Sequence, residues 1–349
     1  MKIVHFISAL DRGGAQRVVV ELSSEQAKRH SVQIWLKCRK ERAFSPTTKV
    51  PIQELSETGC LSFIKTIRTL RRNFLREDVD VLVAHSNRNT VPGIIAARLS
   101  GVPVVAMEHS VYGGLRSRIW RILRHLTYPL ATFVVVLSRD QRSKYPGARV
   151  RVIPNPLENV NNRQNVRSKP AEAQLRILFA GRLERVKGLD RLIEICRHLT
   201  IPYHLDIVGS GSQETRARQL VSIAGIDSNV TFHGWQGQLL EFFDSADVIA
   251  VTSRIEGFGL VVIEAMSRGC VPIVYNVEGG LKDIIDDGVD GFLVQNDDVQ
   301  GFAMRLHEIW TNRDRTREMA SAGKSKSEAF RVDKVVQRWD RLLLNIEKD

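Results

Sequence analysis

The sequence predicts an α/β protein with two doubly wound, Rossmann-like domains. The chain has 349 residues, more than one hydrophobic core usually spans, and 43% of them are hydrophobic. Short apolar runs alternate with segments of helical period, except over residues 154–173, which are polar and interrupted by proline. We therefore expect domains over residues 1–160 and 161–330, followed by a helical stripe within 331–349. Ligands of such sheets bind beyond the carboxyl ends of the strands, here in a cleft between the domains.

The apolar runs define the expected elements in order. In the first half, two helices are expected at 16–29 and 92–100, and the strands are expected at 3–8, 32–36, 81–85, 104–108 and 133–137. In the second half, helices are expected to begin near residues 188 and 260, and the strands are expected at 176–180, 204–208, 230–233, 248–252, 271–274 and 292–294.

Two glutamates, Glu256 and Glu264, flank a glycine-framed turn in the segment EGFGLVVIE. The glycines permit close backbone approach, and the apolar residues that follow have helical period. The turn therefore leads onto a helix N-terminus, which favours a phosphate, while carboxylates on either side can accept hydrogen bonds from sugar hydroxyls. A phosphate between two polyols describes a nucleotide sugar. The predicted donor-binding residues of this motif are Gly257, Phe258, Gly259, Leu260, Val261 and Glu264.

Two cations upstream strengthen this interpretation. Alone, the glutamates could be a helix cap and a solvated side chain, since most carboxylates face water. In LRILFAGRLERVKGLDRLIEI, however, a strand ends at Gly181, a helix begins near Gly188, and Arg182 and Lys187 lie between them. Cations at the carboxyl end of a strand can neutralise a diphosphate leaving group. We therefore predict catalytic roles for Arg182, Lys187 and Glu256.

These motifs give the chain a resemblance to the family 4 retaining glycosyltransferases of the GT-B fold. The likeness covers most of the chain and includes HFISALDRGGAQRVVVELS, EHS, VIPNP, GRLERVKG, DIVGSGS, VTFHGW and EGFGLVVIEAMSRGCVPIV. The resemblance implies two Rossmann-like domains facing a central cleft and retention of anomeric configuration. It also implies that the helix within 331–349 crosses back to the first domain. The donor it implies is a nucleoside-diphosphate sugar, with UDP-sugars expected ahead of GDP-mannose.

Glycines at two further strand ends are predicted to bind the donor. Gly13 and Gly14 follow the first strand, where they could serve only to make the turn or could bring bare backbone to a phosphate or sugar. Gly209 and Gly211 resemble the family's loop whose backbone faces the nucleotide. Neither pair is a dinucleotide fingerprint, because the third glycine is missing. Trp235 is expected near the base.

Polar residues also follow two strands of the first domain. His109 comes directly after the run 104–108, and the resemblance implies a place close to the reacting sugar, where it is predicted as a catalytic residue that orients the donor or positions the acceptor. A lone histidine can equally be structural. His85, Ser86 and Asn87, at the end of another strand, are candidates for acceptor contact.

No metal or cofactor is expected. Two cations and a helix dipole can stabilise the departing diphosphate, and no Asp-x-Asp cluster occurs in a suitable loop. The four cysteines, Cys38, Cys60, Cys196 and Cys270, are scattered without metal-binding spacing, so we expect packed thiols and neither a disulfide scaffold nor zinc.

Basic charge suggests the class of acceptor. Lys and Arg number 51 against 39 Asp and Glu, a formal net charge of +12, and basic residues cluster in two amphipathic stretches at 63–76 and 115–125. Such stretches suit an anionic membrane surface, although both could be ordinary helices packed on a sheet. We expect a lipid-linked or oligosaccharide acceptor and no nucleic-acid partner, because no recognition motif accompanies the charge. The predicted acceptor or membrane residues of the second stretch are Arg116, Arg118, Trp120, Arg121 and Arg124.

The predicted function is transfer of a hexose or N-acetylhexosamine to a saccharide acceptor during assembly of a bacterial surface polysaccharide, lipopolysaccharide or glycan. A nucleotide-sugar 2-epimerase on the same fold and a noncatalytic nucleotide-sugar-binding subunit are the alternatives. No apolar run approaches eighteen residues, and the start MKIVHFISAL has the pattern of a strand rather than a leader. We therefore expect a cytoplasmic protein, peripheral at the inner face of the cytoplasmic membrane.

Overall fold

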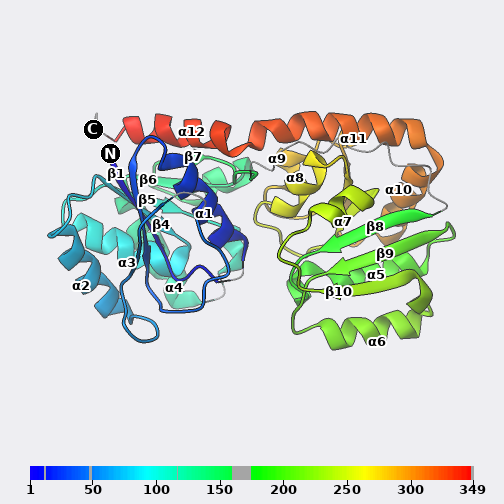
Figure 1. Ribbon diagram of the computed structural model, residues 1–349, viewed down its shortest axis with the longest axis horizontal. Coiled ribbons are helices and arrows are strands. Elements are labelled where there is room, and N and C mark those ends of the chain that lie inside the picture. The colour runs from blue at the N-terminus through cyan, green and yellow to red at the C-terminus, as the bar shows by residue number, and fades with distance from the viewer. Residues whose placement is uncertain (12, 47–48, 116, 159–173, 347–349) are drawn as a thin grey trace. The chain divides into compact units, whose positions relative to one another are not determined.

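The computed structural model describes residues 1–11, 13–46, 49–115, 117–158 and 174–346. By its contacts the chain divides into two compact units, Met1–Glu158 with Arg331–Asp349, and Asn159–Phe330. Each unit has one parallel sheet with helices on both faces (Figure 1), which confirms the predicted α/β class with two doubly wound sheets. The predicted boundary at residues 160–161 lies outside the described residues.

The first unit contains a seven-stranded parallel sheet in the order β3-β2-β1-β4-β5-β6-β7. Its strands are β1 (Lys2–Ile7), β2 (Ser31–Leu36), β3 (Ile52–Glu54), β4 (Val81–His85), β5 (Val104–Met107), β6 (Phe133–Val136) and β7 (Val150–Val152). Its α-helices are α1 (Gly14–Gln26), α2 (Phe63–Phe74), α3 (Asn87–Arg98), α4 (Arg118–Thr127) and α12 (Val332–Leu344). The strand order reverses between β1 and β4, which is the topological switch point of the sheet.

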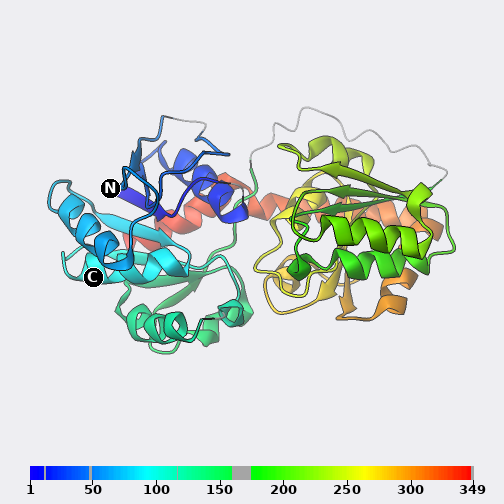
Figure 2. The ribbon, with the colours of Figure 1, turned by 90° about the horizontal axis from the view of Figure 1, so that it is seen from below.

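Helices cover both faces of this sheet. The helices α2, α3 and α4 lie along one face, where α3 contacts both of the others (Figure 2), and α1 packs against α12 on the other. Trp339 of α12 is fully buried, and Asp340 accepts hydrogen bonds from Arg29 at 2.7 Å and from the imidazole of His30 at 3.2 Å. The last helix therefore completes the first unit.

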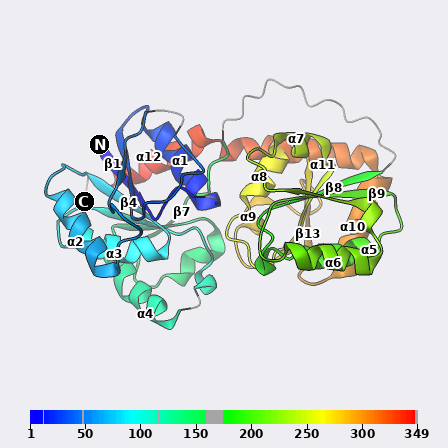
Figure 3. The ribbon, with the colours of Figure 1, turned by 60° about the horizontal axis from the view of Figure 1, so that its bottom comes forward.

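The second unit contains a six-stranded parallel sheet in the order β10-β9-β8-β11-β12-β13, with its switch point between β8 and β11. Its strands are β8 (Leu175–Ala180), β9 (Tyr203–Val208), β10 (Val230–Gly234), β11 (Val248–Val251), β12 (Val271–Asn276) and β13 (Phe292–Gln295). Its α-helices are α5 (Leu189–Arg197), α6 (Glu214–Ala224), α7 (Leu240–Ser245), α8 (Leu260–Ser267), α9 (Leu281–Ile284), α10 (Val299–Thr311) and α11 (Arg313–Ser327). Figure 3 shows this sheet between α5, α6 and α10 on one side and α7, α8 and α11 on the other.

The central strands are recognisable in the sequence because a sheet covered on both faces buries both sets of side chains, which gives near-continuous apolar runs. The runs VLVAH of β4 and VIAV of β11 are buried at every position. Two short edge strands, β3 with IQE and β7 with VRV, were not predicted, since three residues without an apolar run carry too weak a signal.

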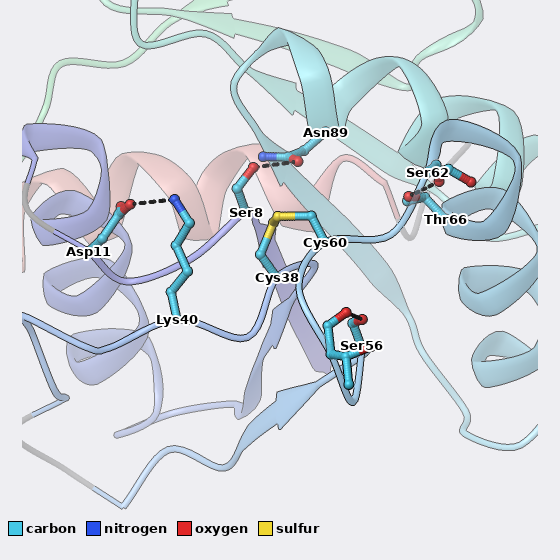
Figure 4. Close-up of a disulfide and its surroundings, with 10 residues drawn as sticks. Ser8, Asp11, Cys38, Lys40, Ser56, Cys60, Ser62, Thr66 and Asn89 are labelled. Carbon is cyan, nitrogen blue, oxygen red and sulfur yellow. Dashed lines mark hydrogen bonds and ion pairs between the residues drawn. A yellow bond between two sulfur atoms is a disulfide. The ribbon is translucent and has the colours of Figure 1, made fainter.

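A disulfide joins Cys38 to Cys60 (Figure 4), so the expectation of packed thiols at these two positions is wrong. Cys38 lies two residues after β2, Cys60 lies three residues before α2, and an antiparallel β-bridge places them side by side. The 22-residue separation gives no local sign of that bridge. Cys196 and Cys270 are buried thiols, as expected, and burial raises the pKa of the Cys196 thiol to about 12.

Candidate active site

The predicted donor residues of the second unit gather at one edge of its sheet. Trp235 follows β10, Gly209 follows β9, Arg182 and Lys187 follow β8, and Glu256 follows β11. These four strands are consecutive neighbours, and the carboxyl ends of parallel strands meet at one edge. The residues therefore surround the switch point between β8 and β11.

An ion pair spans this switch point. The Nζ atom of Lys187 lies 2.7 Å from the Oε2 atom of Glu256, and the hydroxyl of Ser253 donates to the same oxygen at 3.0 Å. Glu256 is only 8% exposed, whereas the Lys187 side chain is 24% exposed. Two of the three residues predicted to act on the donor thus share one partly covered site. Arg182 is exposed on the same loop.

Close backbone packing holds the loops after β8 and β11 together. Gly188 has a φ of +69°, and a Cβ atom at this position would lie 2.0 Å from the carbonyl oxygen of Thr252. The hydroxyl of Thr252 donates to the carbonyl of Gly188 at 2.8 Å. Arg254 forms two hydrogen bonds, of 2.9 and 2.7 Å, with the carboxylate of Asp190. These contacts therefore fix the two loops that carry Lys187 and Glu256 relative to each other.

The glycines after β9 are required by a second close approach. Gly209 has a φ of +143°, and a Cβ atom there would lie 1.8 Å from the carbonyl oxygen of Gly181. A Cβ atom on Gly211 would lie 2.5 Å from the carbonyl oxygen of Leu183. These glycines therefore have a packing role in addition to any contact with a nucleotide.

The turn after Glu256 leads directly into α8. Gly259 precedes the helix with a φ of +99°, and Leu260 and Val261 stand in the first turn, where backbone N–H groups lack intrahelical acceptors. Glu264 lies half-buried in the same helix. Phe258 is 3% exposed, and its ring packs edge-on against Phe330. Because the ring is covered, the predicted contact of Phe258 with the donor would be made by its backbone.

In the first unit, His109 belongs to a chain of three histidines. The Nε2 atom of His109 lies 3.0 Å from Nδ1 of His85, and Nε2 of His85 lies 2.9 Å from Nδ1 of His5. The chain ends at Gln26 of α1, whose Oε1 atom lies 2.7 Å from Nε2 of His5. His5, His85 and Gln26 are fully buried. His85 was predicted to contact the acceptor, which is wrong because its side chain is covered.

Burial keeps these imidazoles neutral. It lowers the pKa of His5 and of His109 from 6.5 to about 4, and it lowers the pKa of His85 well below its usual value. Sequence reasoning missed His5 and Gln26. The available signal was a histidine inside the otherwise apolar run IVHFI.

A second buried network includes Glu108, the residue before His109 in the chain. The Tyr128 hydroxyl donates to Oε1 of Glu108 and is within 2.7 Å of the Thr90 hydroxyl. Burial raises the pKa of Glu108 to about 7. Asn87 donates to the Tyr128 hydroxyl at 3.3 Å and is 8% exposed, and its contact with the acceptor stays a prediction. Ser86 is partly exposed with a φ of +69°, a strained value for a residue other than glycine.

The basic stretch at 115–125 overlaps α4, and its predicted side chains differ in exposure. Arg124 is 2% exposed, its guanidinium lies 3.7 Å from the Tyr112 ring centroid, and it donates to the Tyr112 carbonyl, so its prediction as an acceptor or membrane contact is wrong. Trp120 is partly buried edge-on against Phe63 of α2. Arg118 and Arg121 are exposed. Arg116 lies outside the described residues.

Gly13 and Gly14, which were predicted to bind the donor, stand at the start of α1, in the first unit.

Known proteins resemble this chain over almost its full length. Residues 12–158 match the family model described as Glycosyltransferase Family 4, and residues 161–326 match the model described as Glycosyl transferases group 1. A Campylobacter jejuni protein is 26% identical, covers 99% of both chains and is named GalNAc-alpha-(1->4)-GalNAc-alpha-(1->3)-diNAcBac-PP-undecaprenol alpha-1,4-N-acetyl-D-galactosaminyltransferase. The amylovoran biosynthesis glycosyltransferase AmsD of Erwinia amylovora is 24% identical over 95% of this chain and 96% of its own.

Solved structures agree on the fold. The Anabaena protein HepE, crystallised with UDP-glucose, superposes with a TM-score of 0.81 at 20% identity, covering 99% of this chain and 100% of its own. The two family models together match most of both units. The chain belongs to the family 4 glycosyltransferases and has the GT-B fold.

Proposed function

We propose that this protein transfers a hexose or N-acetylhexosamine, with retention of configuration, from a UDP-sugar to a lipid-linked saccharide during assembly of a bacterial surface glycan. The observation that carries the proposal is the ion pair of Lys187 and Glu256 over the switch point, next to the N-terminus of α8. That site offers a cation and backbone N–H groups for a diphosphate and a carboxylate for sugar hydroxyls. The UDP-glucose bound by the Anabaena protein supports UDP as the carrier.

Each group of the site has a role in this reaction. As the bond between the anomeric carbon and the diphosphate oxygen breaks, Lys187, Arg182 and the N–H groups of Leu260 and Val261 stabilise the negative charge on the leaving oxygen. Glu256 holds hydroxyls of the sugar and fixes the ring against the diphosphate. Glu264 accepts hydrogen bonds from the ribose. These cations and the helix dipole suffice for the leaving group, so the proposed reaction uses no metal.

Retention follows if the acceptor attacks the face that the diphosphate leaves. A bond forms between the acceptor oxygen and the anomeric carbon, and the proton of the acceptor hydroxyl passes to the departing diphosphate oxygen. A leaving group that is held firmly on that face can serve as the base for the incoming hydroxyl.

The surface of α2 and α4 favours a lipid-linked acceptor. Phe63 and Trp120 bring the two helices into contact. Exposed residues of the two helices combine cations with aliphatic side chains, which suits an anionic bilayer surface. We call these residues the docking face: Ile64, Lys65, Arg68, Arg71, Arg72, Arg118, Ile119, Arg121, Ile122 and Leu126. The name of the Campylobacter relative also contains a PP-undecaprenol acceptor.

The aliphatic residues of α4 make the docking face unusual. Ile119, Ile122 and Leu126 are 70%, 59% and 63% exposed, whereas Arg124 of the same helix is buried. An ordinary amphipathic helix packed on a sheet has the opposite arrangement. In the part of the chain that the structure describes, no helix is both long and apolar enough to cross a membrane. The proposed attachment is therefore peripheral, at the inner face of the cytoplasmic membrane.

Vesicle binding tests the docking face. Replacing Arg118 and Arg121 by glutamine is expected to weaken binding to phosphatidylglycerol vesicles by about 10- to 30-fold, because each cation near the surface contributes about 1 kcal/mol. Serine at Ile119 and Ile122 should weaken it further. The control is Ile223→Ser on α6, which removes an even more exposed aliphatic side chain from the second unit. Binding that is unchanged by all four α4 substitutions would exclude this face.

Product analysis tests the reaction itself. We expect UDP-sugars to raise the melting temperature more than GDP-mannose does, and one of them to be consumed with release of UDP and formation of a glycosylated, polyprenyl-linked product. Consumption of the donor without any acceptor, with formation of a second nucleotide sugar, would identify the 2-epimerase. Stabilisation by a donor that is never turned over with any acceptor would identify the binding subunit.

A further inference from the structure

The three histidines of the first unit form a diagonal row on one face of its sheet. In the strand register His5 lies opposite Val83, and His85, two residues further along β4, lies opposite Met107 of β5. Side chains two residues apart on a strand share a face. Each step from His5 to His85 to His109 therefore moves one strand across and two residues towards the carboxyl ends. The row leads from the core under α1 to the edge of the sheet.

Only one arrangement of protons fits the row when Gln26 accepts a hydrogen bond. A neutral imidazole has one N–H donor and one bare nitrogen acceptor. If Oε1 of Gln26 accepts from Nε2 of His5, then Nδ1 of His5 must accept from Nε2 of His85. By the same rule, Nδ1 of His85 accepts from Nε2 of His109. The proton of His109 then resides on Nε2, and its Nδ1 atom is an acceptor.

The Nδ1 atom at the outer end of the row is both buried and unsatisfied. It has no hydrogen-bond partner among the residues that the structure describes, although the His109 residue itself is partly exposed. A buried acceptor without a donor is costly, and a ligand hydroxyl would relieve that cost. Stacking fixes the ring plane, because the centroids of His85 and His109 are 5.3 Å apart with 24° between the rings.

We propose that Gln26, His5 and His85 are positioning residues that hold His109 in one tautomer, with its Nδ1 atom directed as an acceptor at a substrate hydroxyl. This role rests on the proposed glycosyl transfer, since it assigns a function to His109 within it. Gln26 contacts no substrate in this scheme. It acts through two intervening rings, and no proton travels along the row.

The tautomer can be measured without any substrate. In protein labelled with ¹⁵N-histidine, two-bond ¹⁵N–¹H correlations distinguish Nδ1–H from Nε2–H, and single His→Gln variants assign the signals. We expect His5, His85 and His109 to be neutral Nε2–H tautomers between about pH 5.5 and 8, the range in which unshifted histidines titrate. Gln26→Met, which removes the accepting oxygen, should convert the His109 signal to a mixture of tautomers.

Two substitutions at Gln26 separate this role from simple packing. Glutamate at this position is an acceptor, so Gln26→Glu should keep the His109 tautomer and most of the activity, whereas Gln26→Met should mix the tautomers and lower the activity. If Gln26 had only a packing role, Gln26→Glu should be the more damaging substitution, because burying a carboxylate costs more than burying a thioether. The matched control is Gln141→Met, which removes another buried amide of the first unit, one that accepts from the Tyr112 backbone at 2.7 Å.

Kinetics supply the second readout, with release of UDP from UDP-glucose as the assay. Gln26→Met is expected to lower kcat by about 3- to 10-fold, the range for one neutral hydrogen bond. In a His109→Phe background the same substitution should change kcat no further. A Gln26→Met effect that persists in that background overturns the proposal.

The two measurements also separate failure of the inference from failure of the proposed function. An Nδ1–H proton on His109, or a tautomer that Gln26→Met leaves unchanged, refutes the row whatever the enzyme does. A correct tautomer in a protein that never releases UDP from UDP-glucose, and that neither binds nor turns over any other nucleotide sugar, refutes the transfer reaction and with it the role of His109, while leaving the hydrogen-bonded row intact.

Discussion

Replacing Glu256 by glutamine is expected to lower kcat by about 100-fold or more while leaving the fold intact. The carboxylate is paired with Lys187 at 2.7 Å beside the N-terminus of α8, so the substitution removes the charge that orders the ammonium and weakens the grip on sugar hydroxyls. Loss of one preorganised electrostatic contact typically costs about 10²- to 10³-fold in kcat. Steady-state release of UDP, with melting temperature measured alongside, gives both quantities.

The partner substitution tests whether the pair acts as a unit. Lys187→Met should cost a similar factor, and the double variant should be much less impaired than the product of the two single effects, because groups that act together are not additive. Glu194→Gln is the control, since it removes a carboxylate that pairs with Arg197 at 2.6 Å on the surface of α5. If Glu256→Gln unfolds the protein and the activity of its folded fraction is normal, the glutamate is a structural cap.

Acid is expected to destabilise the first unit between about pH 6.5 and 4. Burial lowers the pKa of His5 from 6.5 to about 4, so over this interval the unfolded chain binds more protons than the folded one. The stabilisation is complete above pH 6.5 and is lost as the pH falls. His5 alone contributes about 3 kcal/mol by this linkage. His85 and His109 act in the same direction.

Glu108 opposes this trend. Burial raises its pKa to about 7, so the folded state binds more protons than the unfolded state between about pH 4.5 and 7 and gains stability as the pH falls. The three histidines together change the stability more than the one carboxyl does, so the first unit loses stability overall as the pH falls. Glu108→Gln should make the acid loss steeper, and His5→Gln should make it shallower.

Hydrogen exchange measures this effect separately in each unit. Protection of the β1 and β4 amides should fall below pH 6.5, with the β8 and β11 amides of the second unit as an internal reference. Protection of β1 and β4 that is constant from about pH 7 to 4.5 would contradict the assignment of buried neutral histidines.

The sequence allowed the arrangement of the candidate site in the second unit to be predicted for a definite reason. Arg182, Lys187 and Glu256 each follow an apolar run, and two buried runs in doubly wound order place their carboxyl ends side by side. The contact of Lys187 with Glu256 follows from that order. Phe258 shows the limit, because the direction of its ring depends on Phe330, a partner 72 positions away in the chain.

Features that depend on register or on distant partners could not be predicted. The row of His5, His85 and His109 requires knowing which residues of three strands lie opposite one another. Arg124 has the helical spacing of a surface arginine, yet stacking on Tyr112 and the presence of Tyr145 within 5.6 Å keep it in the interior. The disulfide likewise depends on a single bridge between two segments without regular structure.

The place of α12 in the first unit has a consequence for biosynthesis. The second unit is one uninterrupted stretch ending at Phe330, so all of its residues are made before α12 is. The first unit is begun earlier but is finished later, because the surface of α1 that contacts α12 stays open until α12 has been made. A chain released after residue 330 would therefore have a complete second unit and an incomplete first unit, although synthesis begins with the first.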